Sequence, residues 1–287
     1  ACVRRDYVAM PQGVEKLRVG SLAADTDWSR ALVGGRVMVH AAARVHIMED
    51  RVSDPLAEFR RVNVRGSLNL ARQAAAAGLQ RFVFISSIKV NGEGTKSGRP
   101  FSADDIAAPL DPYGISKMEA EQGLQEIAAQ TGMEVVIIRP PLVYGPGVKA
   151  NFRAMMHWLT QGVPLPLGAI HNRRSLVALD NLVDLIVTCL EHPAAANQTF
   201  LVSDGEDLST TQLLQRMGQA LGKPARLFPF PSALIKIGAT LVGKRAVAQR
   251  LCGSLQVDIS KTRRLLGWSP PVSVDEGLKK AAQGYLA

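Results

Sequence analysis

Arg81-Phe-Val-Phe-Ile-Ser-Ser87 and Asp111-Pro-Tyr-Gly-Ile-Ser-Lys117 are the stretches that decide the fold. The first is an apolar run that ends in serines, as expected of a strand buried in a parallel sheet. In the second, Asp111 suits an N-cap and Pro112 the first helical position, and Gly132 suits the end of the same helix. Buried strands that alternate with long helices predict an α/β fold with a parallel sheet.

Tyr113 and Lys117 lie one turn apart on the same face of this predicted helix. A tyrosine hydroxyl ordinarily has a pKa of ~10, and a neighbouring cation is expected to lower the pKa of Tyr113. Ser87, at the end of the preceding strand, can hydrogen-bond the same reacting oxygen. We therefore predict Ser87, Tyr113 and Lys117 as catalytic residues for general acid/base interconversion of a carbonyl and an alcohol. The alternative is a solvated helix surface without chemistry.

Composition narrows the class of protein. The 287 residues are 47% hydrophobic and 21% charged, which suits one or two globular domains. The net charge of +9 comes without a long Lys/Arg run, so no nucleic-acid partner is predicted. Cys2, Cys189 and Cys252 lack metal-ligand spacing, so they are predicted to be reduced core residues of a cytoplasmic protein without a metal site.

No apolar stretch reaches the ~18 residues of a membrane span. The fairly apolar segment 232–251 is interrupted by Lys236 and Arg250, among other cations. It predicts an amphipathic packing helix, with contact to a membrane surface or to a second subunit as alternatives. A homodimer is left open.

Further motifs extend the pattern along the chain: Asn63-Val-Arg-Gly66, Arg139-Pro-Pro-Leu-Val-Tyr-Gly-Pro-Gly147 and the closing segment 258–268. Together with Ser87 and the Tyr-x-x-x-Lys pair, they make nearly the whole chain similar to the extended short-chain dehydrogenase/reductase family, in its sugar-nucleotide epimerase/dehydratase branch. The resemblance implies a Rossmann-like doubly wound parallel sheet and a smaller C-terminal substrate domain. It assigns residues 1–147 and 175–203 to a dinucleotide-binding domain, and residues 148–174 and 204–287 to a UDP-sugar-binding domain.

The same resemblance implies a nicotinamide dinucleotide cofactor. Relatives begin with a strand, a glycine-rich turn and a helix, and no Gly-x-x-Gly-x-x-Gly stands near the start of this sequence. We therefore expect the first strand-helix unit to be missing from this chain; the alternative is a protein that lacks the loop and binds no dinucleotide. Arg4 and Arg5 suit a 2′-phosphate, which slightly favours NADP over NAD, unless they are only exposed arginines at a strand end. The other residues expected at the cofactor are Ser21, Leu22, Ala41, Ala42, Ala43, Asn63, Ser86, Tyr113, Lys117, Pro140, Leu142 and Val143.

The resemblance also implies a UDP-sugar as substrate. Asn151 is expected at the diphosphate-sugar, Leu165 and Pro166 beside the uracil, and Arg174 on the diphosphate, which a guanidinium binds well. Plain surface roles are the alternatives for Asn151 and Arg174. The remaining residues expected at the substrate are Ser87, Lys89, Asn91, Tyr113 and Arg250.

The expected reaction takes place at C4 of the sugar. The serines of UDP-glucose 4-epimerases usually lead to Val-Tyr-Gly, whereas this chain reads Ser86-Ser-Ile-Lys-Val-Asn-Gly-Glu93. This difference favours reduction of a UDP-4-keto-6-deoxy-N-acetylhexosamine for surface polysaccharide over 4-epimerisation of UDP-glucose or UDP-N-acetylglucosamine. A reductase of steroid-like or other apolar carbonyls and a non-catalytic dinucleotide-binding sensor are the remaining alternatives.

Overall fold

The computed structural model describes residues 1–3, 10–45, 54–96, 98–241, 243 and 245–287. The chain forms two compact units. The first comprises residues 1–92, 106–139 and 189–200, and the second comprises residues 93–105, 140–188 and 201–287. These bounds differ from those of the predicted domains, because residues 93–105, 140–147, 175–188 and 201–203 belong to the second unit. The assignment of one domain to the dinucleotide and the other to the UDP-sugar remains a prediction.

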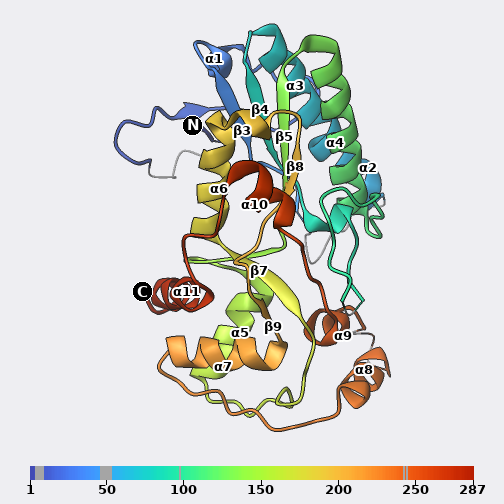
Figure 1. Ribbon diagram of the computed structural model, residues 1–287, viewed down its shortest axis with the longest axis vertical. Coiled ribbons are helices and arrows are strands. Elements are labelled where there is room, and N and C mark those ends of the chain that lie inside the picture. Colours follow the sequence, from blue (N-terminus) through green and yellow to red (C-terminus); the bar gives the residue numbers. More distant parts are fainter. Residues whose placement is uncertain (4–9, 46–53, 97, 242, 244) are drawn as a thin grey trace. The chain divides into compact units, whose positions relative to one another are not determined.

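The first unit is built on a four-stranded sheet (Figure 1). Its strand order is β3 (Val37–His40), β4 (Arg81–Ile85), β5 (Glu134–Arg139) and β8 (Thr199–Leu201). β3 runs parallel to β4 and β4 parallel to β5. A separate parallel pair is formed by β1 (Cys2–Val3) and β2 (Leu17–Arg18). The predicted α/β fold with parallel strands is therefore confirmed.

Among the helices of the first unit, α4 begins and ends where the sequence signals predicted. The helical elements are α1 (Ser29–Leu32), α2 (Pro55–Phe59), the π-helix η1 (Arg60–Gly66), α3 (Ser67–Ala76), the 3-10 helix η2 (Ile88–Val90), α4 (Pro112–Thr131) and the 3-10 helix η3 (Pro193–Ala195). The Asp111 side chain accepts a hydrogen bond from the Gly114 amide at 2.6 Å and caps α4. Gly132 ends α4 with a φ of 76°, which a residue without Cβ adopts freely.

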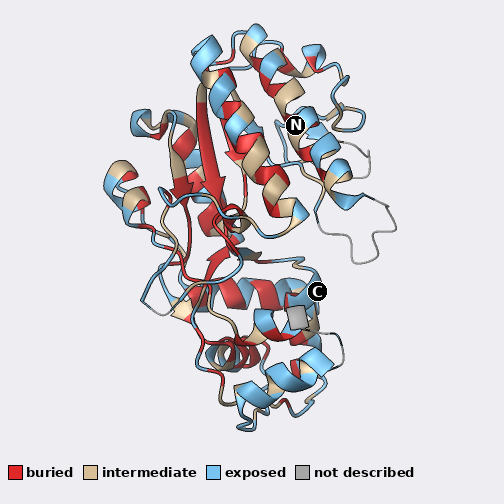
Figure 2. Ribbon diagram, turned by 90° about the vertical axis from the view of Figure 1, so that its right-hand side faces the viewer, coloured by how far each residue is buried: buried red, intermediate tan, exposed pale blue. Residues whose placement is uncertain are grey.

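The core of this unit lies between its sheet and its helices. Phe82 and Phe84 of β4 pack with Leu124 of α4 and with Leu70 of α3. Figure 2 shows the buried residues of the central strands β4 and β5 in red, and exposed residues of the helices in pale blue. This packing fixes the carboxyl ends of the strands, where ligands of open α/β sheets bind.

The second unit contains a smaller mixed sheet. β6 (Leu142–Tyr144) runs parallel to β7 (Arg174–Ala178), and β7 pairs antiparallel with β9 (Asp207–Leu208). Its helices are α5 (Ala150–Thr160), α6 (Leu179–Glu191, with its last residues in the first unit), α7 (Thr210–Ala220), α8 (Ser232–Leu241), α9 (Arg245–Cys252), α10 (Ser260–Leu266) and α11 (Val274–Leu286).

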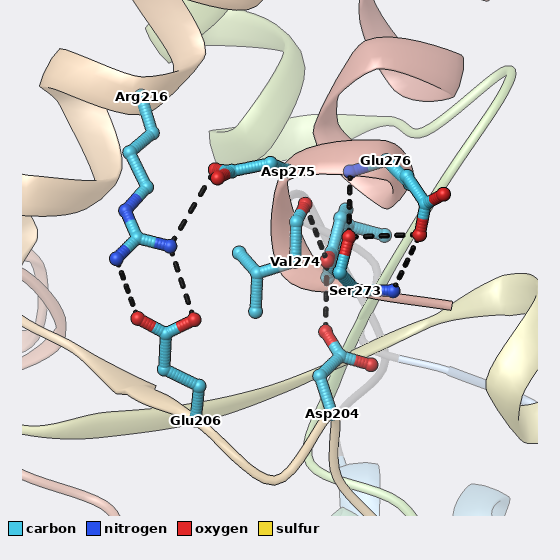
Figure 3. Close-up of polar contacts among 8 residues, drawn as sticks. Asp204, Glu206, Arg216, Ser273, Val274, Asp275 and Glu276 are labelled. Carbon is cyan, nitrogen blue, oxygen red and sulfur yellow. Dashed lines mark hydrogen bonds and ion pairs between the residues drawn. The ribbon is translucent and has the colours of Figure 1, made fainter. Parts of the chain in front are cut away.

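Tyr144 is part of a buried polar network in the second unit. Its hydroxyl donates to Asp204 at 2.8 Å, and the same carboxylate accepts from the Asn181 side chain at 2.7 Å. Figure 3 shows Asp204 beside the start of α11, and Arg216 between Glu206 and Asp275. Burial and the charge of Asp204 raise the pKa of Tyr144 well above its usual value. Tyr144 therefore acts as a structural hydrogen-bond donor.

Two sequence-based expectations were wrong. Cys189 and Cys252 are buried, but Cys2 is exposed at the start of the short strand β1. The segment 232–251 forms two helices, α8 and part of α9, in place of one packing helix, and α8 has no buried residue. No helix in the described part of the chain combines the length and the apolar character that crossing a membrane requires.

Candidate active site

The first unit brings Ser87, Tyr113 and Lys117 together. Ser87 follows β4, and its side chain is hydrogen-bonded to Tyr113 in the first turn of α4. Lys117, one turn further along α4, donates from Nζ to the backbone oxygen of Ile85 at 2.7 Å. Its Nζ lies 4.0 Å from the ring centroid of Phe84. All three predicted catalytic residues thus meet at the carboxyl end of β4.

Burial sets the protonation of this group. Desolvation, with the nearby charge of Asp111, raises the pKa of Tyr113 to about 12, although the hydrogen bond with Ser87 opposes the shift. Desolvation also lowers the pKa of Lys117 to about 7, against the charge of Glu121. The expectation that Lys117 lowers the pKa of Tyr113 was wrong for this arrangement, because burial disfavours the charged form of both side chains. Tyr113 is a neutral proton donor here.

A buried ion pair lies next to the catalytic residues and joins the elements that carry them. Glu121, one turn beyond Lys117 on α4, pairs with Arg139 at the end of β5 with an N–O distance of 2.6 Å. Ser86 donates a short hydrogen bond to Glu121, and Asn91 accepts one from Arg139 at 3.0 Å. The sequence analysis did not identify Glu121 or Arg139 as site residues. Glu121 follows Lys117 by four residues, and Arg139 directly precedes Pro140. Because the pair joins α4 to the ends of β4 and β5, it fixes the backbone beside Ser87.

Three side chains that were predicted to contact a ligand bond to other side chains of the protein: Ser86, Lys89 and Asn91. Ser86 and Asn91 are buried in the network just described. Lys89 forms an ion pair with Asp111, the residue that caps α4. The structure thus shows these three side chains as parts of the wall around the site, and their contact with a ligand remains a prediction.

The carboxyl end of β3 leads into three residues with small side chains. Ala41 and Ala42 are exposed and Ala43 is half-buried, so small side chains leave the backbone approachable. Asn63 is buried, and its amide donates to the backbone oxygen of Arg44 and to the Ser116 hydroxyl, each at 3.0 Å. These bonds tie the segment after β3 to α4, so Asn63 acts by holding that segment. The described residues fit a dinucleotide at this edge.

The other predicted cofactor residues belong to other segments of the chain, and two of them are outside the description. Arg4 and Arg5 are outside the described residues. Ser21 is exposed, and Leu22 is half-buried against Gly66, where a Cβ would lie 2.8 Å from the Leu22 side chain. In the second unit, Pro140 is buried, Leu142 is exposed and Val143 is half-buried.

The second unit brings two of the predicted substrate residues together. Arg174 is half-buried, donates to the backbone oxygen of Gly253 at 3.1 Å, and has its pKa lowered by burial and by the charge of Arg250. Two guanidinium groups that repel each other suit an anionic ligand, which neutralises both.

The remaining substrate residues are placed separately. Asn151 is exposed in the first turn of α5, and Pro166 is half-buried. Leu165 is buried in the core, and its backbone is hydrogen-bonded to Arg226 and Phe228. The Leu165 side chain is therefore a core residue, and its contact with a uracil remains a prediction.

Comparisons with known proteins agree with this geometry. The family described as "NAD dependent epimerase/dehydratase family" matches residues 3–203. A UDP-glucose 4-epimerase from Vibrio cholerae is 53% identical over 293 residues, covering 99% of this chain and 89% of that protein. An N-acetyl-alpha-D-glucosaminyl-diphospho-ditrans,octacis-undecaprenol 4-epimerase from Escherichia coli O157:H7 is 27% identical, covering 94% of this chain and 83% of that protein.

A solved structure has the same fold. The UDP-glucuronic acid 4-epimerase from Bacillus cereus, in complex with NAD, superposes with a TM-score of 0.72 at 22% identity, covering 91% of this chain and 78% of that one. The Rossmann-like character of the parallel sheet, expected from the sequence, is thereby confirmed.

Proposed function

Because the chain belongs to the NAD dependent epimerase/dehydratase family and is an NAD-dependent sugar-nucleotide enzyme, we propose that it is a 4-epimerase of a UDP-sugar. The observation that carries the proposal is the 53% identity to a UDP-glucose 4-epimerase along 99% of the chain. The preference for ketoreduction, drawn from Ser86-Ser-Ile-Lys-Val-Asn-Gly-Glu93, receives no support from that relative. An epimerase and a 4-ketoreductase need the same Ser87, Tyr113 and Lys117, so the motifs alone do not separate the two reactions.

In the proposed reaction the bound NAD supplies a two-electron acceptor that returns the hydride to C4. In the oxidation half, the O4–H bond would break and the phenolate form of Tyr113, stabilised by the charge of Lys117, would take the proton, while the C4 hydrogen would leave with its electron pair. In the return half, Tyr113 gives the proton back to O4, and the hydride is added to the opposite face of C4. Ser87 holds the reacting oxygen against Tyr113, which its hydrogen bond to that residue supports.

Lys117 has two roles in this proposal. As a cation it stabilises negative charge on the tyrosine oxygen, and as a donor it can bind a ribose hydroxyl. The lowered pKa of Lys117, about 7, makes its charge responsive to what binds beside it. The hydrogen bond from Lys117 Nζ to the backbone oxygen of Ile85 keeps the Lys117 side chain at the end of β4.

The diphosphate of the substrate is assigned to Arg174 and Arg250. The repulsion between the two guanidinium groups supports this role, because an anion bound between them would neutralise that repulsion. Asn151, Leu165 and Pro166 remain proposals for the sugar diphosphate and the uracil. Use of NADP rests on Arg4 and Arg5 alone, and a comparison of NAD and NADP binding tests it.

Product analysis tests the proposed function. The protein is incubated with NAD and, separately, with UDP-glucose, UDP-N-acetylglucosamine and a UDP-4-keto-6-deoxy-N-acetylhexosamine supplied with NADH. We expect a C4 epimer from at least one of the first two substrates, with no net change in reduced cofactor. Stoichiometric consumption of NADH by the keto-sugar, with no epimer from either other substrate, would show a ketoreductase instead.

A further inference from the structure

The ammonium group of Lys117 is buried against an aromatic ring. The side chain of Lys117 is 1% exposed, and Phe84 of β4 is fully buried. The Lys117 Nζ lies over the Phe84 ring, 4.0 Å from its centroid. A cation within about 6 Å of an aromatic face is attracted by the negative charge of that face, most strongly where water is excluded. The ring therefore stabilises a charge that burial alone disfavours.

The ring is one of two partners that the protein offers to this ammonium. Lys117 Nζ carries three N–H donors, and one of them is used by the Ile85 backbone oxygen at 2.7 Å. Within the described part of the chain, Nζ forms no further hydrogen bond or ion pair. Because a buried cation with so few partners is costly, loss of the ring should favour the neutral form of Lys117.

The titratable groups around Lys117 do not replace the ring. Glu121 on α4 favours the charged lysine, but its carboxylate is already paired with Arg139 of β5 at 2.6 Å. Tyr113 on α4 is neutral, because burial raises its pKa to about 12. Burial still lowers the pKa of Lys117 to about 7 in the presence of these groups.

His40 packs against the same ring from the neighbouring strand. His40 of β3 pairs in register with Phe84, and the two rings stack with their centroids 5.7 Å apart. The His40 Nε2 lies 2.8 Å from the Ser67 hydroxyl. Burial and the charge of Lys117 lower the pKa of His40 to about 3, so His40 adds no second cation beside the Phe84 ring.

We propose that Phe84 is a positioning residue for Lys117, and that its ring face keeps the buried ammonium charged at the end of β4. The contact between the ring and the ammonium stands on its own geometry. Its consequence for catalysis rests on the proposed function, in which the charge of Lys117 stabilises negative charge on the Tyr113 oxygen.

The titration of Lys117 tests the proposal without substrate or cofactor. The protein is labelled with lysine that carries carbon-13 at Cε, and the NMR signal of Lys117 is identified by its absence from Lys117→Met. Phe84→Leu removes the ring, so the midpoint of the Lys117 titration should fall by about 1 pH unit or more. Phe82→Leu is the matched control, because Phe82 is equally buried on β4 and its ring contacts His40. It should leave the midpoint unchanged.

A variant that preserves the shape of the ring separates its charge from its packing. A trifluorinated phenylalanine in place of Phe84 draws electrons away from the ring face, so it should shift the Lys117 midpoint in the same direction as Phe84→Leu. Thermal melts check that each variant is folded, and the fluorinated protein decides if Phe84→Leu does not fold. A midpoint that stays unchanged in the fluorinated protein, or that falls as far in Phe82→Leu as in Phe84→Leu, overturns the proposal.

The pH dependence of kcat tests the link to catalysis. Above both midpoints the charged fraction of Lys117 falls in proportion to the shift, so kcat of Phe84→Leu should be about tenfold below that of the unchanged enzyme at about pH 8. At about pH 6 the two should agree within about threefold. An equal loss of kcat at both pH values would overturn the positioning role. If the unchanged protein epimerises no UDP-sugar, the proposed function fails, and the NMR midpoints alone decide the role of Phe84.

Discussion

At the scale of single residues, the tyrosine hydroxyl of Tyr113 is the group on which the proposed chemistry depends. Tyr113→Phe keeps the ring and its edge contact with Phe59, so the fold should be unchanged. We expect kcat to fall by about 10³-fold or more, because a positioned proton donor is lost.

Tyr144→Phe is the matched control for that variant. It removes a tyrosine hydroxyl too, but one that is bonded to Asp204 in the buried polar network of the second unit. It should lower the free energy of unfolding by about 1–3 kcal/mol and leave kcat within a few-fold. Activity of Tyr113→Phe within threefold of the unchanged enzyme would exclude Tyr113 as the proton donor.

Arg174→Ala tests the anion site of the second unit. We expect KM for the UDP-sugar to rise 10- to 100-fold, about 1.4–2.8 kcal/mol, with a smaller effect on kcat. Arg173→Ala removes the neighbouring, exposed guanidinium and should leave KM unchanged. If the two variants have the same steady-state kinetics, Arg174 does not bind the diphosphate.

His40 predicts a pH dependence of stability. The ring is buried, and its Nε2 lies 2.8 Å from the Ser67 hydroxyl. Desolvation, with the charge of Lys117, lowers the pKa of His40 to about 3 from its usual 6.5. Below about pH 6.5, His40 therefore binds a proton in the unfolded chain but stays neutral in the folded protein. The free energy of unfolding consequently falls as the pH decreases from about 6.5 towards 3.

Urea unfolding at several pH values measures this effect. Between pH 6 and 4 the free energy of unfolding should fall more steeply for the unchanged protein than for His40→Asn, by up to about 1.4 kcal/mol per pH unit. Parallel slopes for the two proteins would mean that His40 takes up its proton while folded.

At the scale of helices and strands, local signals made prediction possible. Asp54, Asp111 and Gly132 mark helix ends through bonds to their own neighbours in sequence, so each could be recognised without tertiary structure. The Glu121–Arg139 pair could not, because its partners come from a helix and a strand that only the fold brings together. The pKa of Tyr113 was mispredicted for the same reason, since burial is a property of the packed unit.

Gly66 tests the packing of the elements around the site. A Cβ at this position would lie 2.8–2.9 Å from the side chain and backbone of Leu22, so Gly66→Ala forces a shift between the π-helix η1 and that loop. We expect a loss of about 1–3 kcal/mol in the free energy of unfolding. Gly238→Ala in α8 meets open space and should be neutral or stabilising by up to about 1 kcal/mol. Equal stability of the two variants would show that Leu22 yields freely.

At the scale of the whole molecule, the sequence predicted the parallel fold and the family, but it did not separate two reactions that share one catalytic group. An epimerase rotates its keto intermediate and keeps its cofactor bound, whereas a reductase releases the oxidised cofactor after each turnover. No short sequence motif reports either property. Composition also concealed the charge distribution: a net charge of +9 without long runs suggested a scattered basic surface, whereas residues 208–257 carry seven cations and no carboxylate.

The most direct test of the central claim follows the C4 hydrogen. UDP-glucose labelled with deuterium at C4 is incubated with the protein and NAD, and the products are separated and analysed by mass spectrometry and NMR. We expect UDP-galactose that retains deuterium at C4, with no net formation of NADH, because the hydride leaves and returns within one bound complex. UDP-galactose without the label, or conversion only of a 4-keto sugar with one NADH oxidised per turnover, would contradict it.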